Sequence, residues 1–313
     1  MLPTQHTVDT PYMVGPVHCY TIDLDGELTL FDTGPPTGAG EQFLRRHIDL
    51  GRLRHVIVTH CHLDHYGLSS WLEKHSEASI YFPSRDIQKV LRHDERLEKM
   101  YGLLGALGFS GTYLDRLRES FYRDVMFPPF PQTYLSAEED IPERLGIEVL
   151  SCPGHSQSDL VYTTGNWAVT GDILLRGIYQ SPLLDIDLGS GQRFNNYQAY
   201  CDTLVKLMRI RGKKILPGHR HRVESVDATI LFYIKKTLYR IAQLKPYIGD
   251  YTVAQIIKRV FGDELTDPFH VYLKASEIVF MKDLLETPET LKNALKQIAL
   301  FDEVAADFER AAA

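Results

Sequence analysis

Residues 58–67, with the sequence VTHCHLDHYG, decide the fold of this chain. They continue an apolar run that begins at Val56 and Ile57 and is typical of a buried strand. Three imidazoles and one carboxylate stand within residues 60–65, and all four side chains can bind a metal ion. On its own the cluster is also compatible with a solvated histidine-rich loop. Its interpretation therefore depends on further ligands elsewhere in the chain.

Three later strands are also predicted to end in a histidine or an aspartate. They are residues 147–151 followed by His155, residues 167–171 followed by Asp172, and residues 213–217 followed by His219. A Pro-Gly pair precedes each of the two histidines, and glycine lets a backbone turn sharply beside a crowded site. Each residue alone indicates only a polar strand end that the backbone satisfies. Together with residues 60–65, they predict that four strand ends meet at one site.

The spacing of these residues suits two metal positions. Residues two apart in an extended chain share a face, so His60 and His62 can bind one ion together. Asp64 and His65 begin a predicted helix and can reach a second position, while Asp172 can bridge two cations. The seven candidates are His60, His62, Asp64, His65, His155, Asp172 and His219. Seven ligands exceed the need of one tetrahedral ion, and their chemistry suits Zn²⁺, Fe or Mn²⁺ rather than Ca²⁺.

Composition and charge indicate a globular protein with an acidic surface. The chain has 313 residues, of which 44% are hydrophobic and 24% charged, so we expect a buried core rather than disorder. The formal net charge of −7 provides no general attraction to phosphate backbones or anionic membranes. We therefore expect a small-molecule substrate, and neither nucleic acid nor a membrane as a partner.

Cysteine usage and the N-terminal segment suggest the cytoplasm. Cys19, Cys61, Cys152 and Cys201 are widely spaced and form no CxxC pair, which favours reduced thiols. The first fifteen residues lack the basic and apolar regions of a signal peptide. No apolar stretch approaches the length that a bilayer requires.

The order of predicted elements indicates one α/β domain with helical additions. A hairpin is expected over residues 17–34, a helix over 41–51, a helix over 64–75 and a strand over 78–83. A helical insert is predicted over residues 84–130, before the strand signals return. We expect a catalytic domain over residues 1–222 and an all-helical extension over residues 223–313.

With these motifs in hand, the chain resembles the metallo-β-lactamase superfamily. The matching segments are DTG at residues 32–34, THCHLDH at 59–65, PGH at 153–155, TGD at 170–172 and PGH at 217–219. They occur in the family's order and cover about residues 15–222. The resemblance implies an α/β fold, an αββα four-layer sandwich with the site at one edge of two packed sheets. The insert and the C-terminal extension would be additions to that fold.

The resemblance also implies a role for each candidate residue. The first metal site would be His60, His62 and His155, and the second would be Asp64, His65 and His219. Asp172 would bridge them, Asp64 would also be the catalytic residue, and Asp32 would orient ligands through hydrogen bonds. Asp32 alone could equally be an ordinary turn carboxylate. The implied cofactors are two divalent ions, with Zn²⁺ favoured over Fe and Mn; the substrate-binding residues stay unassigned.

The implied reaction is hydrolysis of an ester or thioester with a small acyl group. A water molecule held between two cations loses a proton near neutral pH, and the resulting hydroxide attacks an electrophilic carbon or phosphorus. The glyoxalase II branch shares all seven ligands. A true β-lactamase is disfavoured, because such enzymes are usually exported.

Three alternatives remain open at this point. The same dinuclear site could serve a phosphodiesterase or ribonuclease. An iron-dependent sulfur dioxygenase would use only His60, His155 and Asp172. A binding protein that retains a vestigial site is the non-enzymatic alternative. We further hypothesise that the aromatic-rich part of the insert, residues 95–125, forms a lid, and that the C-terminal helices pack on the domain or form a homodimer.

Overall fold

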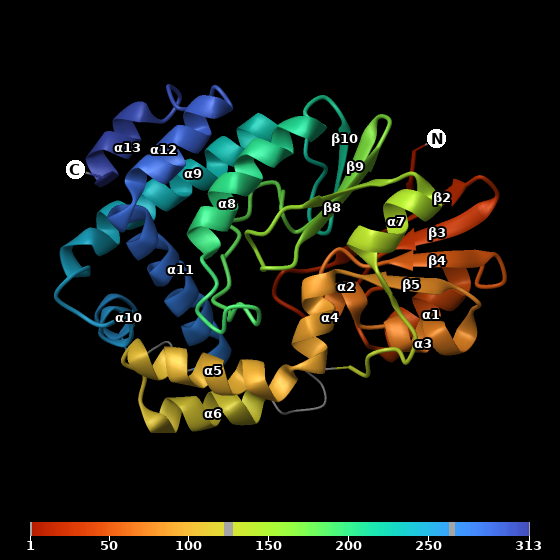
Figure 1. Cartoon of the computed structure of the whole chain (residues 1–313), viewed down its shortest axis with the longest axis horizontal. Helices are drawn as coiled ribbons and strands as arrows, with labels where there is room; N and C mark the ends of the chain where they lie inside the picture. Colours follow the sequence, from red (N-terminus) through yellow and green to blue (C-terminus); the bar gives the residue numbers. More distant parts are fainter. Residues whose placement is uncertain (1, 122–127, 263–266, 313) are drawn as a thin grey trace.

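The computed structural model describes residues 2–121, 128–262 and 267–312. Residues 122–127 of the expected insert, and residues 263–266 and 313 of the expected extension, lie outside this description. Two β-sheets pack face to face, and helices cover their outer faces (Figure 1). This is the αββα sandwich that the sequence resemblance implies.

The first sheet has the strand order β1-β2-β3-β4-β5-β6. Its strands are β1 (Thr4–Val8), β2 (Val17–Leu24), β3 (Glu27–Phe31), β4 (Leu53–Ile57), β5 (Ser79–Phe82) and β6 (Leu135–Ser136). The predicted hairpin is the antiparallel pair β2 and β3. Its two turn residues, Asp25 and Gly26, have φ values of 52° and 92°, as the tight hairpin turn with two left-handed residues requires.

The second sheet has the order β10-β9-β8-β7, and β7, β9 and β10 lie where strands were expected. The strands are β7 (Glu148–Ser151), β8 (Leu160–Thr164), β9 (Trp167–Gly171) and β10 (Lys214–Pro217). Strands β9 and β10 run parallel, so Asp172 and His219 follow strand ends at the same edge of the sheet.

Large aromatic side chains fill the space between the sheets. The buried cluster includes Tyr20, Phe31, Ile57 and Tyr81 from the first sheet and Tyr162, Trp167, Val169 and Leu216 from the second. Complete burial of one such side chain stabilises the fold by roughly 1.5–3 kcal/mol. Two tyrosine hydroxyls also cross the interface: Tyr20 donates to the Pro217 carbonyl and Tyr162 to the Val58 carbonyl, each at 2.7 Å. These bonds fix the two sheets relative to each other beside the ligand loops.

The helices form the outer layers and the additions. Those outside the two sheets include α1 (Gly38–His47), α2 (Leu63–Tyr66), α3 (Ser69–His75), α7 (Ala137–Leu145) and α8 (Asn196–Lys206). The insert contains α4 (Ser84–Leu91), α5 (His93–Ala106) and α6 (Gly111–Phe121). The C-terminal helices are α9 (Val226–Leu244), α10 (Val253–Phe261), α11 (Pro268–Glu286), α12 (Pro288–Gln297) and α13 (Ala305–Ala312). Within the described parts of the chain, no helix is both long enough and apolar enough to cross a membrane.

The helix predicted over residues 64–75 is two helices in the structure. Helix α2 ends at Tyr66, and α3 begins at Ser69. Gly67 lies between them, where an added Cβ atom would overlap the Leu63 carbonyl oxygen and the Pro36 ring. The chain therefore turns against Pro36 here, which helical periodicity alone does not reveal.

A buried carboxylate in the loop after β9 holds the insert in place. Asp185 is 4% exposed; it accepts a hydrogen bond from Arg96 Nε at 2.6 Å and lies 3.5 Å from Lys89 Nζ. Burial alone would raise the pKa of Asp185, but Arg96 and Lys89 lower it to about 2. A carboxyl whose folded-state pKa is depressed stabilises the fold above its unfolded pKa of about 3.9. This contribution disappears as the pH falls through about 2.

We expect Asp185→Asn to lower the free energy of unfolding by about 2 kcal/mol at pH 7, since one pKa unit corresponds to about 1.36 kcal/mol. Urea unfolding between pH 7 and pH 2 measures this, and the difference from the wild type should shrink below about pH 4. The control is Asp227→Asn, which removes the half-exposed pair with Arg211 and should change stability by less than about 1 kcal/mol. A difference for Asp185→Asn that is constant with pH would contradict the electrostatic explanation.

Candidate metal centre

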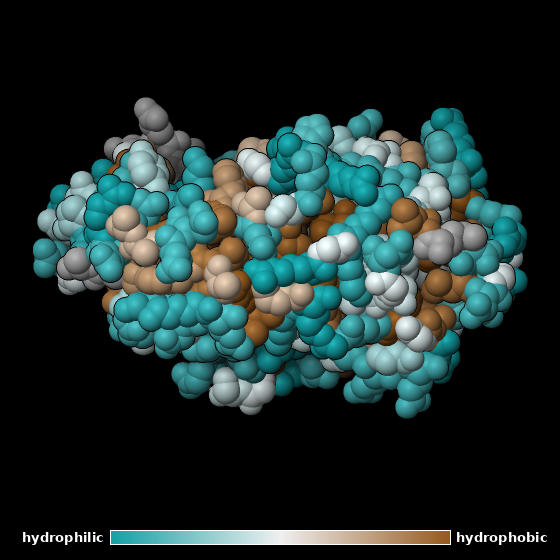
Figure 2. All heavy atoms as spheres, turned by 90° about the horizontal axis from the view of Figure 1, so that it is seen from above, coloured by the Kyte–Doolittle hydropathy of each residue, from teal (hydrophilic) through white to brown (hydrophobic). Residues whose placement is uncertain are grey.

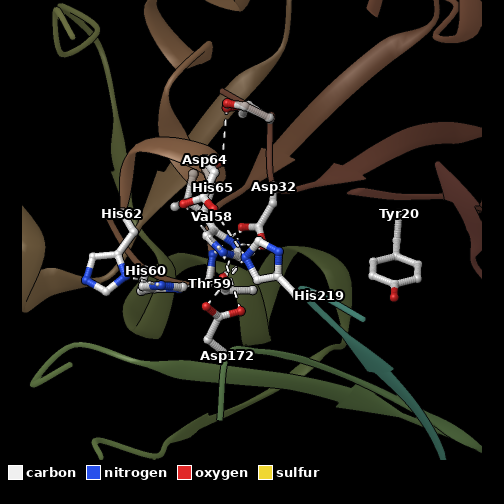
Figure 3. A network of polar contacts seen from close by, with 12 residues as sticks. Tyr20, Asp32, Val58, Thr59, His60, His62, Asp64, His65, Asp172 and His219 are labelled. Atoms are coloured by element: carbon white, nitrogen blue, oxygen red, sulfur yellow. Dashed lines mark hydrogen bonds and ion pairs between the residues drawn. The ribbon is translucent and has the colours of Figure 1, made fainter. Parts of the chain in front are cut away.

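All seven candidate ligands meet at one edge of the sandwich. Figure 3 labels all of them except His155. His60 and His62 lie just beyond the end of β4, while Asp64 and His65 lie on the short helix α2. The remaining three follow β7, β9 and β10 and are His155, Asp172 and His219. Strand β4 ends at Ile57, so His60 and His62 belong to a loop and not to the extended strand used to predict their shared face. Their side chains converge nevertheless.

The first group consists of three histidine nitrogens. His62 Nδ1 lies 2.9 Å from His60 Nε2 and 3.0 Å from His155 Nε2. The three ligand atoms are all within 4.8 Å of one another, the arrangement that one metal ion needs. We call His60, His62 and His155 the first triad.

The second group contains a carboxylate and two histidines. His219 Nε2 lies 3.2 Å from Asp64 Oδ2, and His65 Nε2 lies 3.9 Å from Asp64 Oδ1. Asp64, His65 and His219 form the second triad, again with ligand atoms within 4.8 Å of one another.

Asp172 lies between the two triads. Its Oδ1 is 3.5 Å from His65 Nε2, and its Oδ2 is 3.6 Å from His219 Nε2 and 3.9 Å from His155 Nε2. The carboxylate therefore contacts ligands of both triads, as a bridging group would.

The polar atoms at this centre fit divalent metal ions. His65 Nε2, His219 Nε2 and Asp172 Oδ1 are buried and have no hydrogen-bond partner among the described residues. Buried polar atoms in native proteins are almost always satisfied, so three orphaned ones at a single point require a further partner. Nitrogen and carboxylate oxygen are the ligands that Zn²⁺ and neighbouring transition metals prefer. The centre can therefore hold divalent transition-metal ions.

Hydrogen bonds from outside the triads orient the imidazole rings. Asp32 Oδ2 accepts from His65 Nδ1 at 2.8 Å, and the same carboxylate accepts from the Thr59 backbone N–H at 2.8 Å. Thr59 Oγ1 donates to Asp32 and lies 3.1 Å from His60 Nδ1. A ring nitrogen held in this way leaves the opposite nitrogen, Nε2, directed at the centre.

Backbone carbonyls perform the same task for two other rings. His155 Nδ1 lies 3.1 Å from the Ser181 carbonyl oxygen, and His219 Nδ1 lies 2.8 Å from that of Pro16. Sequence reasoning missed both, since a carbonyl carries no side-chain signal. It also gave no role to Thr59, although this residue stands inside the quoted motif.

The electrostatics of the two triads differ. Burial and the surrounding histidines hold the pKa of His60 well below its ordinary value and lower that of His62 to about 3, so both rings are neutral at pH 7. Burial would also lower the pKa of His65, but Asp32 and Asp172 raise it well above its ordinary value. Asp172 has its own pKa lowered by His219 and His65 despite burial. The second triad and the bridging residue thus form a charge-paired cluster.

Gly218 allows the backbone to approach Asp172. A Cβ atom at this position would lie 2.5 Å from Asp172 Oδ1 and 2.6 Å from His65 Cε1. The glycine of this Pro-Gly-His segment was expected to permit a sharp turn. The structure adds a second reason, which is that any side chain here would occupy the space of a ligand.

We expect Asp32→Asn to weaken metal binding by roughly 10–100-fold, the usual effect of changing a hydrogen-bond partner of a ligand. The amide can still accept from Thr59, but its NH₂ group would face the N–H of His65. Asp32 has φ +57°, a conformation that asparagine also adopts, so backbone strain should not differ. Chelator competition measures the affinity. Asp25→Asn, at φ +52° in an exposed hairpin turn, is the matched control, and an equal loss there would refute the orienting role.

Two sheets packed face to face between helices, with five histidines and two aspartates gathered at one sheet edge, define an αββα protein with a candidate metal centre. The model of the metallo-beta-lactamase superfamily matches residues 12–219, and the chain belongs to this family. The family and fold implied by the sequence motifs are thereby confirmed.

Similarity to known proteins extends beyond residues 12–219. The chain is 27% identical over 307 residues to the probable metallo-hydrolase YqjP of Bacillus subtilis (strain 168), covering 91% of this chain and 92% of that protein. Among solved structures, a metallo-beta-lactamase family protein from Thermus thermophilus is 22% identical with a TM-score of 0.68, covering 91% of this chain and 93% of that one. A beta-lactamase domain protein from Burkholderia ambifaria is 21% identical with a TM-score of 0.70, covering 90% and 86%. These two structures share the fold along almost the whole chain, additions included.

Proposed function

We propose that the protein is a metallo-hydrolase that cleaves an ester or thioester with a small acyl group, using two divalent ions. The observation that carries this proposal is the presence of two complete triads that both contact Asp172. The name of the Bacillus subtilis relative, a probable metallo-hydrolase, supports the reaction class. Zn²⁺ is the favoured ion, with Fe and Mn as the alternatives.

The ligand residues would hold the metal ions, and Asp64 would also transfer a proton. Divalent ions held here would polarise the substrate and lower the pKa of a water molecule from about 15.7 to about 7. Asp172 contacts ligands of both triads and would bind both ions. Burial would raise the pKa of Asp64, but His65 and His219 hold it below its ordinary value, so the carboxylate is ionised at pH 7. It can accept the proton of the attacking water, after which the proton passes to the departing oxygen or sulfur.

A small aromatic cleft of about 20 Å³ lies beside the centre, and its walls would have to move apart to admit an acyl group. It is lined by Gly154, Tyr179, Gln180, Pro182, Tyr200, Tyr233, Thr237 and Phe280. Gly154 precedes His155, and the Gln180 side chain donates to the Asp172 carbonyl, so the cleft borders both the first triad and the bridge. We propose these walls as the substrate-binding region.

Two observations favour this reaction over the alternatives. A sulfur dioxygenase would need only His60, His155 and Asp172, whereas the second triad is also assembled here. The net charge of −7 disfavours a nucleic-acid substrate for a phosphodiesterase using the same centre. A small molecule in the cytoplasm is the proposed substrate, and four cysteines without disulfide partners are consistent with that compartment.

The proposal is tested by metal analysis together with a substrate panel. We expect about two transition-metal ions per chain and faster turnover of thioester, ester or lactone substrates than of bis(p-nitrophenyl) phosphate. Faster phosphodiester cleavage would favour the nuclease alternative, and one iron per chain with oxygen consumption would favour the dioxygenase. Bound metal without turnover of any substrate would favour a binding protein. Asp172→Asn serves as the control for contaminating activity.

A homodimer through the C-terminal helices stays a prediction. Tyr239 on α9 is 63% exposed, a surface position of the kind that such an interface would use. Figure 2 shows hydrophobic patches interleaved with hydrophilic side chains on the face seen from above, and not one continuous apolar surface. Sedimentation at several protein concentrations distinguishes a monomer from a dimer.

A further inference from the structure

Helix α4 of the insert contains a buried aspartate that contacts both loops of the first triad. Asp86 is 2% exposed. Its Oδ2 accepts from the backbone N–H of Cys61 at 2.8 Å, and Cys61 stands between His60 and His62. Its Oδ1 accepts from the Ser158 hydroxyl at 2.6 Å, in the loop that begins at His155. One carboxylate thus joins the two segments that supply the three histidines.

Further hydrogen bonds connect Ser158 to the residue that follows His155. Ser158 Oγ lies 3.1 Å from Ser156 Oγ, and Ser156 directly follows His155. The backbone N–H of Ser156 donates to Asp159 Oδ2 at 2.6 Å, which closes the loop on itself. A shift of Asp86 would therefore move the whole loop, and not Ser158 alone.

An ion pair with Lys89 stabilises the buried Asp86 carboxylate. Lys89 lies one turn further along α4, with Nζ 2.9 Å from Asp86 Oδ1 and donating to Ser158 Oγ at 2.9 Å. Lys89 is also 3.5 Å from Asp185, which binds Arg96 of α5. A buried charge is stable only when it is paired and hydrogen-bonded, and this arrangement meets both conditions.

The first triad needs such a connection because its ligands come from separate segments. Zinc–nitrogen distances are about 2.0–2.1 Å, so small relative movements of the two loops would separate the nitrogens from a shared ion. Asp32 supports the other side of the centre, where it contacts His65 and Thr59. The two supporting carboxylates thus contact different segments around the centre.

We propose that Asp86 is a positioning residue for the first triad, holding the His60–His62 segment and the His155 loop at metal-binding distance through Cys61 N and Ser158 Oγ. The insert therefore supports the metal centre directly, whether or not another part of it covers the substrate. This inference rests on the proposed metal site.

The test measures metal affinity in folded variants. Asp86→Ala should lower the affinity of one of the two sites by roughly 10–100-fold in chelator competition, the usual range for a supporting group. Asp86→Asn keeps one acceptor and Ser158→Ala keeps the Cys61 bond, so both should show smaller losses in the same direction. Asp283→Asn, which breaks the partly buried pair with Arg193 away from the ligand loops, is the matched control and should leave the affinity unchanged. Circular dichroism and urea unfolding establish that each variant is folded.

Backgrounds that lack one triad show which site Asp86 serves. In a His219→Ala background, Asp86→Ala should reduce the affinity of the remaining site further. In a His155→Ala background, where the first triad is already broken, it should have no additional effect. If Asp86→Ala does not fold, Ser158→Ala and Asp86→Asn in the same two backgrounds decide the matter.

Two outcomes would overturn the inference, and they can be told apart. Folded Asp86 variants whose two site affinities match the wild type would show that Asp86 only stabilises the fold. An equal affinity loss in Asp283→Asn would lead to the same conclusion. A wild-type protein that binds no transition metal would overturn the proposed function and this inference together, whereas a wild type that binds two ions and hydrolyses esters would leave the proposed function intact.

Discussion

Asp172→Asn is expected to lower kcat/KM by on the order of a thousandfold and to remove at least one bound ion per chain. Asp172 contacts His65 and His219 of the second triad and His155 of the first. The substitution removes the negative charge that two adjacent cations would share. Metal-ion catalysis contributes several kcal/mol, and each 1.36 kcal/mol corresponds to a tenfold change in rate.

Metal content and steady-state kinetics on the best substrate of the panel test this expectation. The control is Asp202→Asn on α8, an exposed aspartate that pairs with Gln198 and should leave both quantities unchanged. If the Asp172 variant kept two ions and the full rate, the carboxylate would not bridge the triads.

Gly218→Ala is expected to reduce metal content and to lower kcat/KM by roughly a hundredfold or more. The new methyl group would lie 2.5 Å from Asp172 Oδ1 and 2.6 Å from His65 Cε1, so one ligand must move. Misplacement by about 1 Å at a reacting centre can lower a rate by roughly a hundredfold. The backbone at Gly218 has no left-handed φ, so steric overlap is the direct cause.

Gly102→Ala is the matched control for this substitution. Gly102 lies inside α5, and a Cβ atom there meets nothing within 4 Å. Alanine should therefore leave activity unchanged and stabilise the helix by roughly 0.5–1 kcal/mol. Full metal content and activity in Gly218→Ala would mean that the loop has more freedom than the structure shows.

Sequence reasoning located the centre because its ligands follow strands with clear hydrophobic patterns. The strand predicted over residues 167–171 coincides with β9, and the others end within about two residues of their expected positions. Convergence of the ligands then followed from the topology of two packed sheets. Their roles as metal ligands stay a prediction that the geometry supports.

Other features depend on contacts between distant segments, which local patterns do not encode. The short edge strands β1 and β6 and the helix α7 were not anticipated. The carbonyl partners of the ligand histidines, and the position of Asp86, arise only when loops from both sheets and the insert come together. A buried aspartate on an amphipathic helix gives no sign in the sequence that it faces a ligand loop.

The division of the chain at residue 222 also stays a prediction. One buried cluster contains Leu104 of the insert, Val161 of β8 and Ile278 of α11, so the additions share a single core with the second sheet. The lid role of residues 95–125 is likewise untested, and residues 122–125 lie outside the described residues. The residues that line the aromatic cleft come from α8, α9, α11 and neighbouring loops.

The candidate ligands come from both sheets, and this affects when the chain could bind metal ions during folding. Segments between strands of the first sheet supply His60, His62, Asp64 and His65, and segments that follow strands of the second sheet supply His155, Asp172 and His219. Neither triad is complete without segments from both sheets, since His155 completes the first and His219 the second. During synthesis, a nascent chain that has emerged only as far as β6 lacks His155, Asp172 and His219, so neither triad is complete. If the proposed metal site is correct, tight uptake of the ions would begin only after the second sheet has docked, and metal loading would report on completed folding.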